Sequence, residues 1–309
     1  MQNLKKRIKA ESEGFSFQDL QGKQRVYFIA GVLFIIAMPV WLLLDPGNSV
    51  AFVLFLLSLL VIQKMKLPTW IKIVIVAFDL VLVIPIVGQT SGTFARVATM
   101  VGIYAILSLG LNIVVGFTGL LNLGYAAFYA VGAYTYAIFA SRQAGKFLSF
   151  GNFPLSGNWF WLFLLIALVV SGFVGFLLGL PVLRLKGDYL AIVTLGFAEI
   201  IRLLFNNMNS PINITNGPMG ITPIQAPMLF NIRLNKPVDY YFIVLGLFLL
   251  TVLVIRNLQN SRIGRAWVAI REDELVARTM GVPVVRMKLL SFSIGAGLAG
   301  MMGVVFAAM

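Results

Sequence analysis

The stretch WFWLFLLIALVVSGFVGFLLGL occupies residues 159–180 and contains no charged side chain. An α-helix rises about 1.5 Å per residue, so a stretch of this length can cross the hydrocarbon core of a bilayer, which is about 30 Å thick. A surface helix of a soluble protein would carry polar residues along one face, and this stretch has no such polar face. It therefore predicts a membrane-spanning helix.

The composition of the whole chain indicates the same environment. Of its 309 residues, 60% are apolar and only 11% are charged, and the mean hydropathy is +0.93. A soluble domain carries about 25% charged residues. The chain has no Cys and no His, which excludes disulfides, thiolate or imidazole metal sites and Cys or His catalysis. The composition therefore excludes a soluble enzyme and a disulfide-rich secreted domain.

Similar apolar runs recur along the chain and predict an all-α, polytopic membrane helix bundle with about nine spans. The expected spans are residues 26–44, 50–62, 70–87, 94–115, 120–140, 159–180, 189–205, 240–255 and 289–309. Residues 50–62 are short for a complete crossing. The junction GFTG at residues 116–119 is either a tight hairpin or the break in a discontinuous helix.

The distribution of basic residues predicts the orientation of the chain in the membrane. With the amino terminus in the cytoplasm, 18 of the 24 Lys and Arg residues fall on the inner side, as the positive-inside rule requires. This explains the net charge of +13 without a nucleic-acid partner. We expect a basic cytoplasmic segment at 1–25, extra membrane spans at 26–93 and a core at 94–309, with an external loop at 206–239 and a cytoplasmic loop at 256–288.

The sequence does not support a nucleotide-binding site of either of two common types. Residues 295–300 read GAGLAG and match the dinucleotide pattern, but no strand precedes them and their surroundings are apolar. Small residues four apart, Ala296 with Gly300 and Ala299 with Gly303, instead favour close helix packing in the membrane. The phosphate-binding pattern GxxxxGK[ST] does not occur in the sequence, so the energy for active transport would have to come from an ion gradient or from another subunit.

Two acidic residues, Asp79 and Glu199, lie inside predicted spans. A charge at the bilayer centre costs about 2.5–3.5 kcal/mol on insertion scales and needs a partner or a wet cavity. Arg202, three residues after Glu199, lies on the same helical face. We expect a structural ion pair near the outer end of a helix. A proton or cation relay, as in an ion-coupled secondary transporter, is the alternative.

Residues 110–124 combine four glycines with the amides of Asn112 and Asn122. Unmet polar groups are costly in hydrocarbon, so these amides either join helices by hydrogen bonds or line a translocation path.

The inner segment 260–281 places Glu272, Asp273 and Glu274 between arginines, and Gly281 supplies a helix stop. Trp267 and Ile270 would not be needed on a solvated face. The pattern favours an amphipathic hairpin that lies in a groove of a cytoplasmic partner.

Four stretches carry a resemblance to a known family: VGFTGLLNLGYAAFYAVGAY (115–134), PVLRLKGDYLAIVTLGFAEIIR (181–202), NGPMGI (216–221) and GRAWVAIREDELVARTMGV (264–282). They resemble the membrane permease subunits of bacterial branched-chain amino acid ABC importers, and among these the subunit with an amino-terminal extension. The first stretch is shared with urea and short-chain amide importers, which remain an alternative for the substrate.

The resemblance implies a non-enzymatic permease, multi-pass in the bacterial inner membrane, that translocates leucine, isoleucine or valine. Its partners would be a homologous second permease, two cytoplasmic ATP-binding subunits and a periplasmic or lipid-anchored substrate-binding protein, besides membrane lipid. The chain itself would bind no cofactor. Because family members continue past a sequence like residues 295–308 with further membrane segments, we also expect a truncated chain.

The resemblance also implies roles for residues in three places. Contact with the ATP-binding subunit falls to Arg271, Glu272, Asp273, Glu274, Ala277 and Gly281. The translocation path would include Asn112, Gly116, Asn122 and Gly124. The loop that faces the binding protein would include Asn213, Gly217 and Gly220.

Overall fold

The computed structural model describes residues 22–65, 68–146, 153–182, 188–210, 212–229 and 232–309. The predicted basic segment at 1–25 lies outside these residues except for its last four. The described chain is almost entirely helical, and its one small sheet pairs β1 (Met228–Leu229) with β2 (Ile232–Arg233) in antiparallel fashion. It divides into two compact units, Met1–Ala98 and Thr99–Met309.

The first unit contains α2 (Gly22–Leu44), α3 (Ser49–Lys64) and a helix made of α4 (Thr69–Phe78), a π-helical turn η2 (Asp79–Val83) and α5 (Ile84–Thr90). Asn48 caps α3, because its side-chain oxygen accepts hydrogen bonds from the backbone N–H groups of Val50 and Ala51. Ile35, Ile62 and Met65 form the buried contact between α2 and α3.

The second unit begins within α6 (Gly92–Asn112), because the boundary between the units falls inside this helix. Helix α6 continues into a π-helical turn, η3 (Ile113–Phe117). The membrane helices that follow are α7 (Tyr125–Phe139), α8 (Phe160–Val182), α9 (Asp188–Asn207), α10 (Pro237–Gln259) and α13 (Val284–Ala308). The short helices are η4 (Ala144–Lys146), η5 (Gly157–Trp159), η6 (Gly217–Met219), α11 (Arg262–Glu272) and α12 (Glu274–Thr279).

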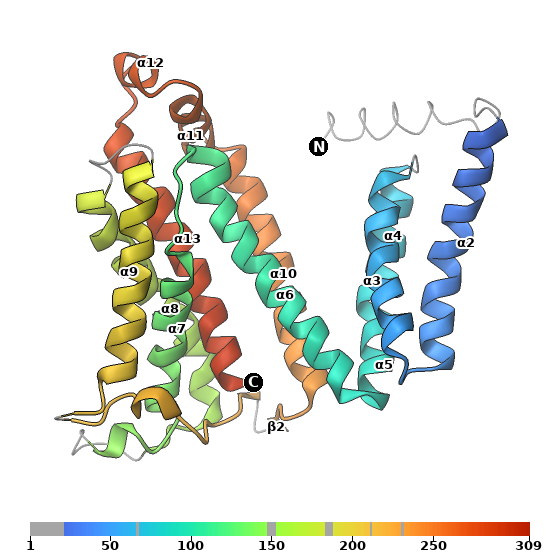
Figure 1. Ribbon diagram of the computed structural model, residues 1–309, viewed down its shortest axis with the longest axis horizontal. Helices are drawn as coiled ribbons and strands as arrows, with labels where there is room; N and C mark the ends of the chain where they lie inside the picture. The colour runs from blue at the N-terminus through green and yellow to red at the C-terminus, as the bar shows by residue number, and fades with distance from the viewer. Residues whose placement is uncertain (1–21, 66–67, 147–152, 183–187, 211, 230–231) are drawn as a thin grey trace. The chain divides into compact units, whose positions relative to one another are not determined.

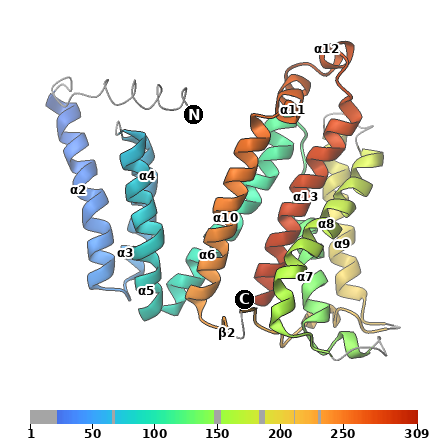
Figure 2. The ribbon, with the colours of Figure 1, turned by 180° about the vertical axis from the view of Figure 1, so that it is seen from behind.

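Helix α13 is the centre of this unit. Most of it is buried, whereas only a minority of the residues in each other candidate span is buried. It lies between α10 and the group α7, α8 and α9 (Figures 1 and 2). Glycines allow this approach: an added Cβ at Gly132 of α7 would overlap the backbone of Gly300, and one at Gly300 would overlap Ser171 of α8. The prediction that residues 295–303 pack helices together is confirmed, and GAGLAG lies within a helix.

Six helices in the described residues are long and apolar enough to cross a membrane: Thr69–Thr90, Gly92–Phe117, Gly157–Val182, Tyr189–Asn207, Pro237–Gln259 and Val284–Ala308. The other predicted spans correspond to shorter apolar helices, Ile29–Leu44, Ser49–Lys64 and α7 with its 15 residues. The chain is a multi-pass helical membrane protein, and the number nine stays a prediction.

The junction after residue 116 is an extended connection and not a tight hairpin, and because the chain reverses direction there, α6 and α7 are not two halves of one discontinuous helix (Figure 1). Residues 119–124 run without helical structure from the end of α6 to the start of α7 (Figure 1). Gly119 takes a positive φ of 70°, and the backbone N–H of Leu123 donates to the Thr194 hydroxyl, at 3.1 Å. The helix expected at 120–140 therefore begins only at Tyr125, because α9 satisfies part of the backbone that a longer helix would have satisfied.

Candidate functional site

Helices α11 and α12 form an elbow at one end of the second unit, beyond the ends of α6, α10 and α13 (Figure 1). Ser261 caps α11 through a hydrogen bond from the backbone N–H of Gly264, and Asp273 ends α11 and caps α12. The Asp273 carboxylate accepts from the N–H groups of Leu275 and Val276, at 2.8 and 3.0 Å. Asp273 therefore sets the sharp turn of the elbow.

The inner face of the elbow is packed against the chain itself. Trp267 is fully buried, its indole N–H donates to the Met287 carbonyl at 2.8 Å, and its ring stacks on Phe117. Ile270 and Ala277 are buried together with Val284 at the start of α13. The prediction that Trp267 and Ile270 need a partner's groove is therefore wrong, since the ends of α6 and α13 bury both.

Charged side chains fix the same elbow to the membrane helices. Arg271 donates to the Gly116 carbonyl at 2.7 Å and also pairs with Glu272 at 2.9 Å. Glu274 accepts a hydrogen bond from Lys288 of α13 at 2.8 Å. Lys288 is buried, so this pair is better shielded from water than an ordinary surface ion pair. A push on the elbow would thus reach both α6 and α13.

The outer face of the elbow remains apolar and open. Leu275 exposes 70% of its surface and Met280 79%, and Val276 beside them is exposed as well. Gly281 follows with a φ of 84°, a conformation that glycine adopts readily. Of the six residues expected to contact an ATP-binding subunit, Ala277 faces inward. The exposed side chains that could take its place are Leu275, Val276 and Met280.

The four residues expected along a translocation path lie around the connection between α6 and α7. Asn112 is exposed, and its side chain fills the space beside Gly116. Asn122 is buried: its oxygen accepts from the N–H of Gly124 at 3.0 Å, while its side-chain nitrogen has no hydrogen-bond partner among the described residues. Gly124 packs so closely on the Thr194 backbone that a side chain would overlap it.

The loop expected to face a binding protein lies at the opposite end of this unit from the elbow (Figures 1 and 2). Gln143, which follows α7, donates to the backbone and side-chain oxygens of Asn213 at 2.8 and 2.7 Å. Asn216 takes a φ of 63° and donates to the Gly220 carbonyl at 2.9 Å. The loop is thus a folded element, and Gly217 is buried within it.

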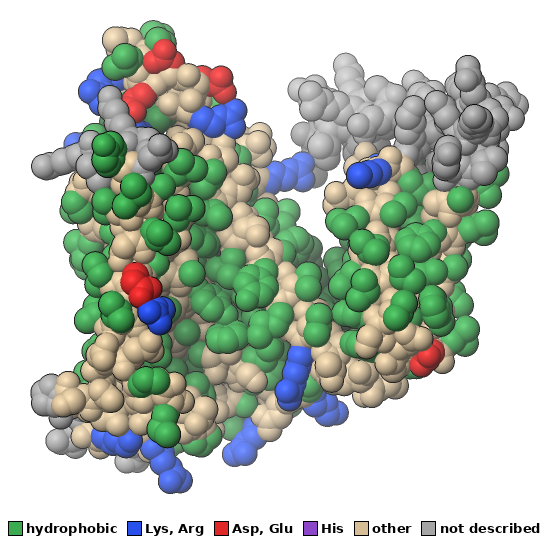
Figure 3. Space-filling view, in the orientation of Figure 1, with side chains coloured by type: hydrophobic (Ala, Val, Ile, Leu, Met, Phe, Trp, Pro, Cys, Tyr) green, Lys and Arg blue, Asp and Glu red, His purple; other side chains and the backbone are tan. Residues whose placement is uncertain are grey.

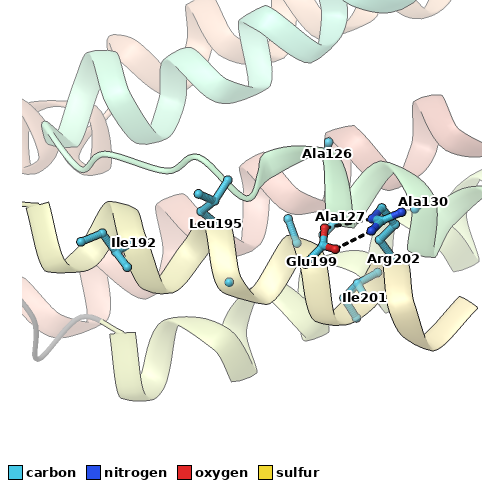
Figure 4. A pocket seen from close by; sticks show the side chains of 10 residues that line it. Ala126, Ala127, Ala130, Ile192, Leu195, Glu199, Ile201 and Arg202 are labelled. Atoms are coloured by element: carbon cyan, nitrogen blue, oxygen red, sulfur yellow. Dashed lines mark hydrogen bonds and ion pairs between the residues drawn. The ribbon is translucent and has the colours of Figure 1, made fainter.

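A groove of about 660 Å³ runs between α7 and α9 (Figure 4). Glu199 and Arg202 line it and form the expected ion pair, in which the Arg202 Nε donates to Glu199 at 2.9 Å. The pair lies in the second half of α9, eight and five residues before its last residue, Asn207, and both side chains are exposed. The spacing of the two residues predicted the pair. The groove could not be predicted in this way, because it forms only where α7 lies beside α9 and no local sequence pattern indicates that neighbour.

The other acid within a span, Asp79, lies in the π-helical turn of the first unit. Its side chain is buried, and one carboxylate oxygen has no hydrogen-bond partner among the described residues. The described residues contain no group of three or more acidic side chains that could hold a metal ion.

Comparisons with known proteins connect this arrangement to one family. The family model described as the permease component of the branched-chain amino acid transport system matches residues 93–309. The chain is 44% identical over 235 residues to the high-affinity branched-chain amino acid transport system permease protein LivM of Salmonella typhimurium and 43% identical to that of Escherichia coli, covering 69% of this chain and 52% of each relative.

A probable branched-chain amino acid transport permease protein LivM of Methanocaldococcus jannaschii is 27% identical over 225 residues, which cover 66% of this chain and 64% of that protein. No solved structure matches the chain significantly. The chain spans about half the length of the two bacterial relatives. The family match covers most of the chain, including the elbow, the groove and the folded loop, and the chain therefore belongs to the family of branched-chain amino acid transport permeases.

Proposed function

We propose that this chain is the membrane-spanning subunit of an ATP-driven importer that moves leucine, isoleucine and valine across the bacterial inner membrane. Its partners would be a homologous second permease, two cytoplasmic ATP-binding subunits and an external substrate-binding protein. The observation that carries the proposal is the elbow of α11 and α12 on a chain of this family: it has an open apolar face and is tied to α6 and α13. ATP would be hydrolysed by the partners and not by this chain.

The elbow suggests how ATP hydrolysis could reach the transport path. A partner that binds Leu275 and Met280 and then moves would displace α11, because the two short helices share the turn at Asp273. Trp267 and Lys288 would pass the displacement to α13, and Arg271 would pass it to the end of α6. Since α13 packs on both α7 and α8, its tilt would change the side of the membrane to which the path opens.

The central test is transport by the assembled complex in proteoliposomes. We expect leucine uptake to require ATP on the side of the membrane where the ATP-binding subunits lie. We expect this uptake to persist when ionophores remove ion gradients. We also expect leucine, delivered by its binding protein, to stimulate ATP hydrolysis more than urea does.

Two other results would assign the chain differently. Stimulation by urea and not by leucine would indicate the urea or amide importer. Uptake that needs an ion gradient and no ATP would indicate an ion-coupled secondary transporter.

The proposed orientation, with the amino terminus and the elbow in the cytoplasm, can be tested by labelling. The sequence contains no Cys, so a single introduced Cys reports one position. Met219, in the folded loop, exposes 86% of its surface, and Met280 is comparably exposed on the elbow. In cells that express this chain alone, a membrane-impermeant maleimide should label Met219→Cys directly and Met280→Cys only after permeabilisation. The reverse pattern would invert the topology.

A further inference from the structure

The ion pair in α9 lies where hydrocarbon alone would not tolerate it. Glu199 and Arg202 expose 53% and 62% of their side chains, within the candidate span Tyr189–Asn207. The space-filling view shows adjacent acidic and basic side chains surrounded by hydrophobic ones over α9 (Figure 3). Charged groups at membrane depth almost always face a bundle interior or a water-filled cavity. This face of α9 is therefore expected to meet water or polar groups rather than lipid.

The groove beside the pair has the size and the walls of a small-molecule site. Its volume of about 660 Å³ falls within the range of about 300–1,000 Å³ that is usual for ligand pockets. Apart from the ion pair, its lining is apolar and includes Ala127 and Ala130 of α7 (Figure 4). Gly196 of α9 lines the same groove, and an added Cβ there would meet nothing within 4 Å. The groove therefore has free space beside Gly196.

The ion pair leaves hydrogen-bonding capacity that a ligand can use. Arg202 donates to Glu199 through Nε and one terminal nitrogen, and the other terminal nitrogen has no partner among the described residues. A guanidinium has five N–H donors, so its outer edge can still bind a carboxylate with two parallel hydrogen bonds. Each oxygen of Glu199 accepts one hydrogen bond here and retains a lone pair that can accept another from an ammonium group.

We propose that this groove binds the transported molecule, and that its ligand is a zwitterionic amino acid with an apolar side chain. Arg202 would bind the α-carboxylate, Glu199 the α-ammonium, and the apolar walls the side chain. The neutral pair and the neutral zwitterion match in total charge, so binding buries no uncompensated charge. This inference rests on the proposed function, since it names the site at which the importer's substrate passes through this subunit.

Charge reversal separates a ligand site from a structural ion pair. Transport of leucine per assembled complex should fall by about tenfold or more in Glu199→Gln and in Arg202→Gln, because each loses a charged partner of the substrate. The double variant Glu199→Arg with Arg202→Glu restores an ion pair at the same spacing but exchanges the positions of the two charges. We expect its transport to stay as low as that of the single variants.

Three results would overturn the proposal. If the double reversal restores uptake to within about twofold of the wild type, the pair is structural. If the single variants transport normally, the groove does not bind the substrate. If the wild-type complex takes up no leucine when ATP is supplied, the proposed function is wrong and this proposal fails with it. If the wild type transports leucine, a negative result with the variants contradicts only the proposed site.

Filling the groove gives a second test that leaves the ion pair unchanged. Gly196→Leu adds a side chain whose Cβ would have no other atom within 4 Å, so we expect folding to be kept. Gly246→Leu on α10 is the matched control, because an added Cβ there also has no atom within 4 Å. We expect Gly196→Leu to lower leucine uptake by about tenfold and the control to stay within about twofold of the wild type. Equal uptake by both variants would overturn the proposal.

Discussion

Replacing Gly132 with leucine should prevent the second unit from folding. The α carbon, carbonyl carbon and carbonyl oxygen of Gly300 occupy the space that a Cβ at Gly132 would need, so α7 and α13 would have to separate. Overpacking of a core typically costs about 1–3 kcal/mol, and a clash with backbone falls at or above the upper end of that range. We expect almost no monodisperse protein in detergent, measured by fluorescence-detected size-exclusion chromatography after expression at matched levels.

The control for this experiment is again a glycine in a membrane helix. Gly246→Leu places the same side chain at a position where no other atom lies within 4 Å of the added Cβ. It should give a wild-type elution profile and a similar melting temperature. A wild-type profile for Gly132→Leu would mean that α7 and α13 are not in backbone contact at this level.

Introducing two aspartates on the outer face of the elbow should abolish capture of the ATP-binding subunit. Leu275→Asp combined with Met280→Asp replaces exposed apolar side chains, so it removes no internal packing. Hot-spot residues near the centre of an interface contribute about 2 kcal/mol or more each, and the loss of two such contacts at Leu275 and Met280 predicts a drop of well over about tenfold in affinity. Co-purification of the complex, followed by quantification of the ATP-binding subunit, measures the effect.

A matched variant at the opposite end of the unit tests whether the effect is local. Ile232→Asp in β2 also replaces an exposed apolar side chain, and it should leave capture unchanged. Full capture by the double variant would show that the elbow's outer face is not the contact. Glu274→Lys is a less specific probe, because it would also leave the buried ammonium of Lys288 facing a second positive charge.

Much of the fold could be predicted from local sequence. The apolar runs predicted membrane helices at 159–180 and 240–255, and the structure confirms both within α8 and α10. The small residues between Ala296 and Gly303 predicted close helix packing, and they pack on α7 and α8. These predictions succeeded because each depends only on composition or spacing within one helix.

The candidate site was predicted less completely. The acidic and basic residues of 260–281 predicted a short helical elbow, yet the pattern could not show that Trp267 packs inward while Leu275 stays open. The junction before α7 had two predicted forms, a tight hairpin or a break in one helix, and the structure shows an extended connection instead. A hydrogen bond to Thr194, about seventy positions away in sequence, holds that connection. The Glu199–Arg202 pair was predicted as structural, and the groove beside it was not predicted.

The sequence by itself determined that this chain resides in a membrane and that its helices pack through small residues. These properties depend on which side chains are present and on their spacing along one helix. Only the tertiary structure decided which apolar side chains of the elbow are free to meet a partner, and that α7 leaves an open groove along the charged side of α9. Those features depend on which helices lie next to one another, because a side chain is buried or exposed according to the element that packs against it and not according to its own stretch of sequence.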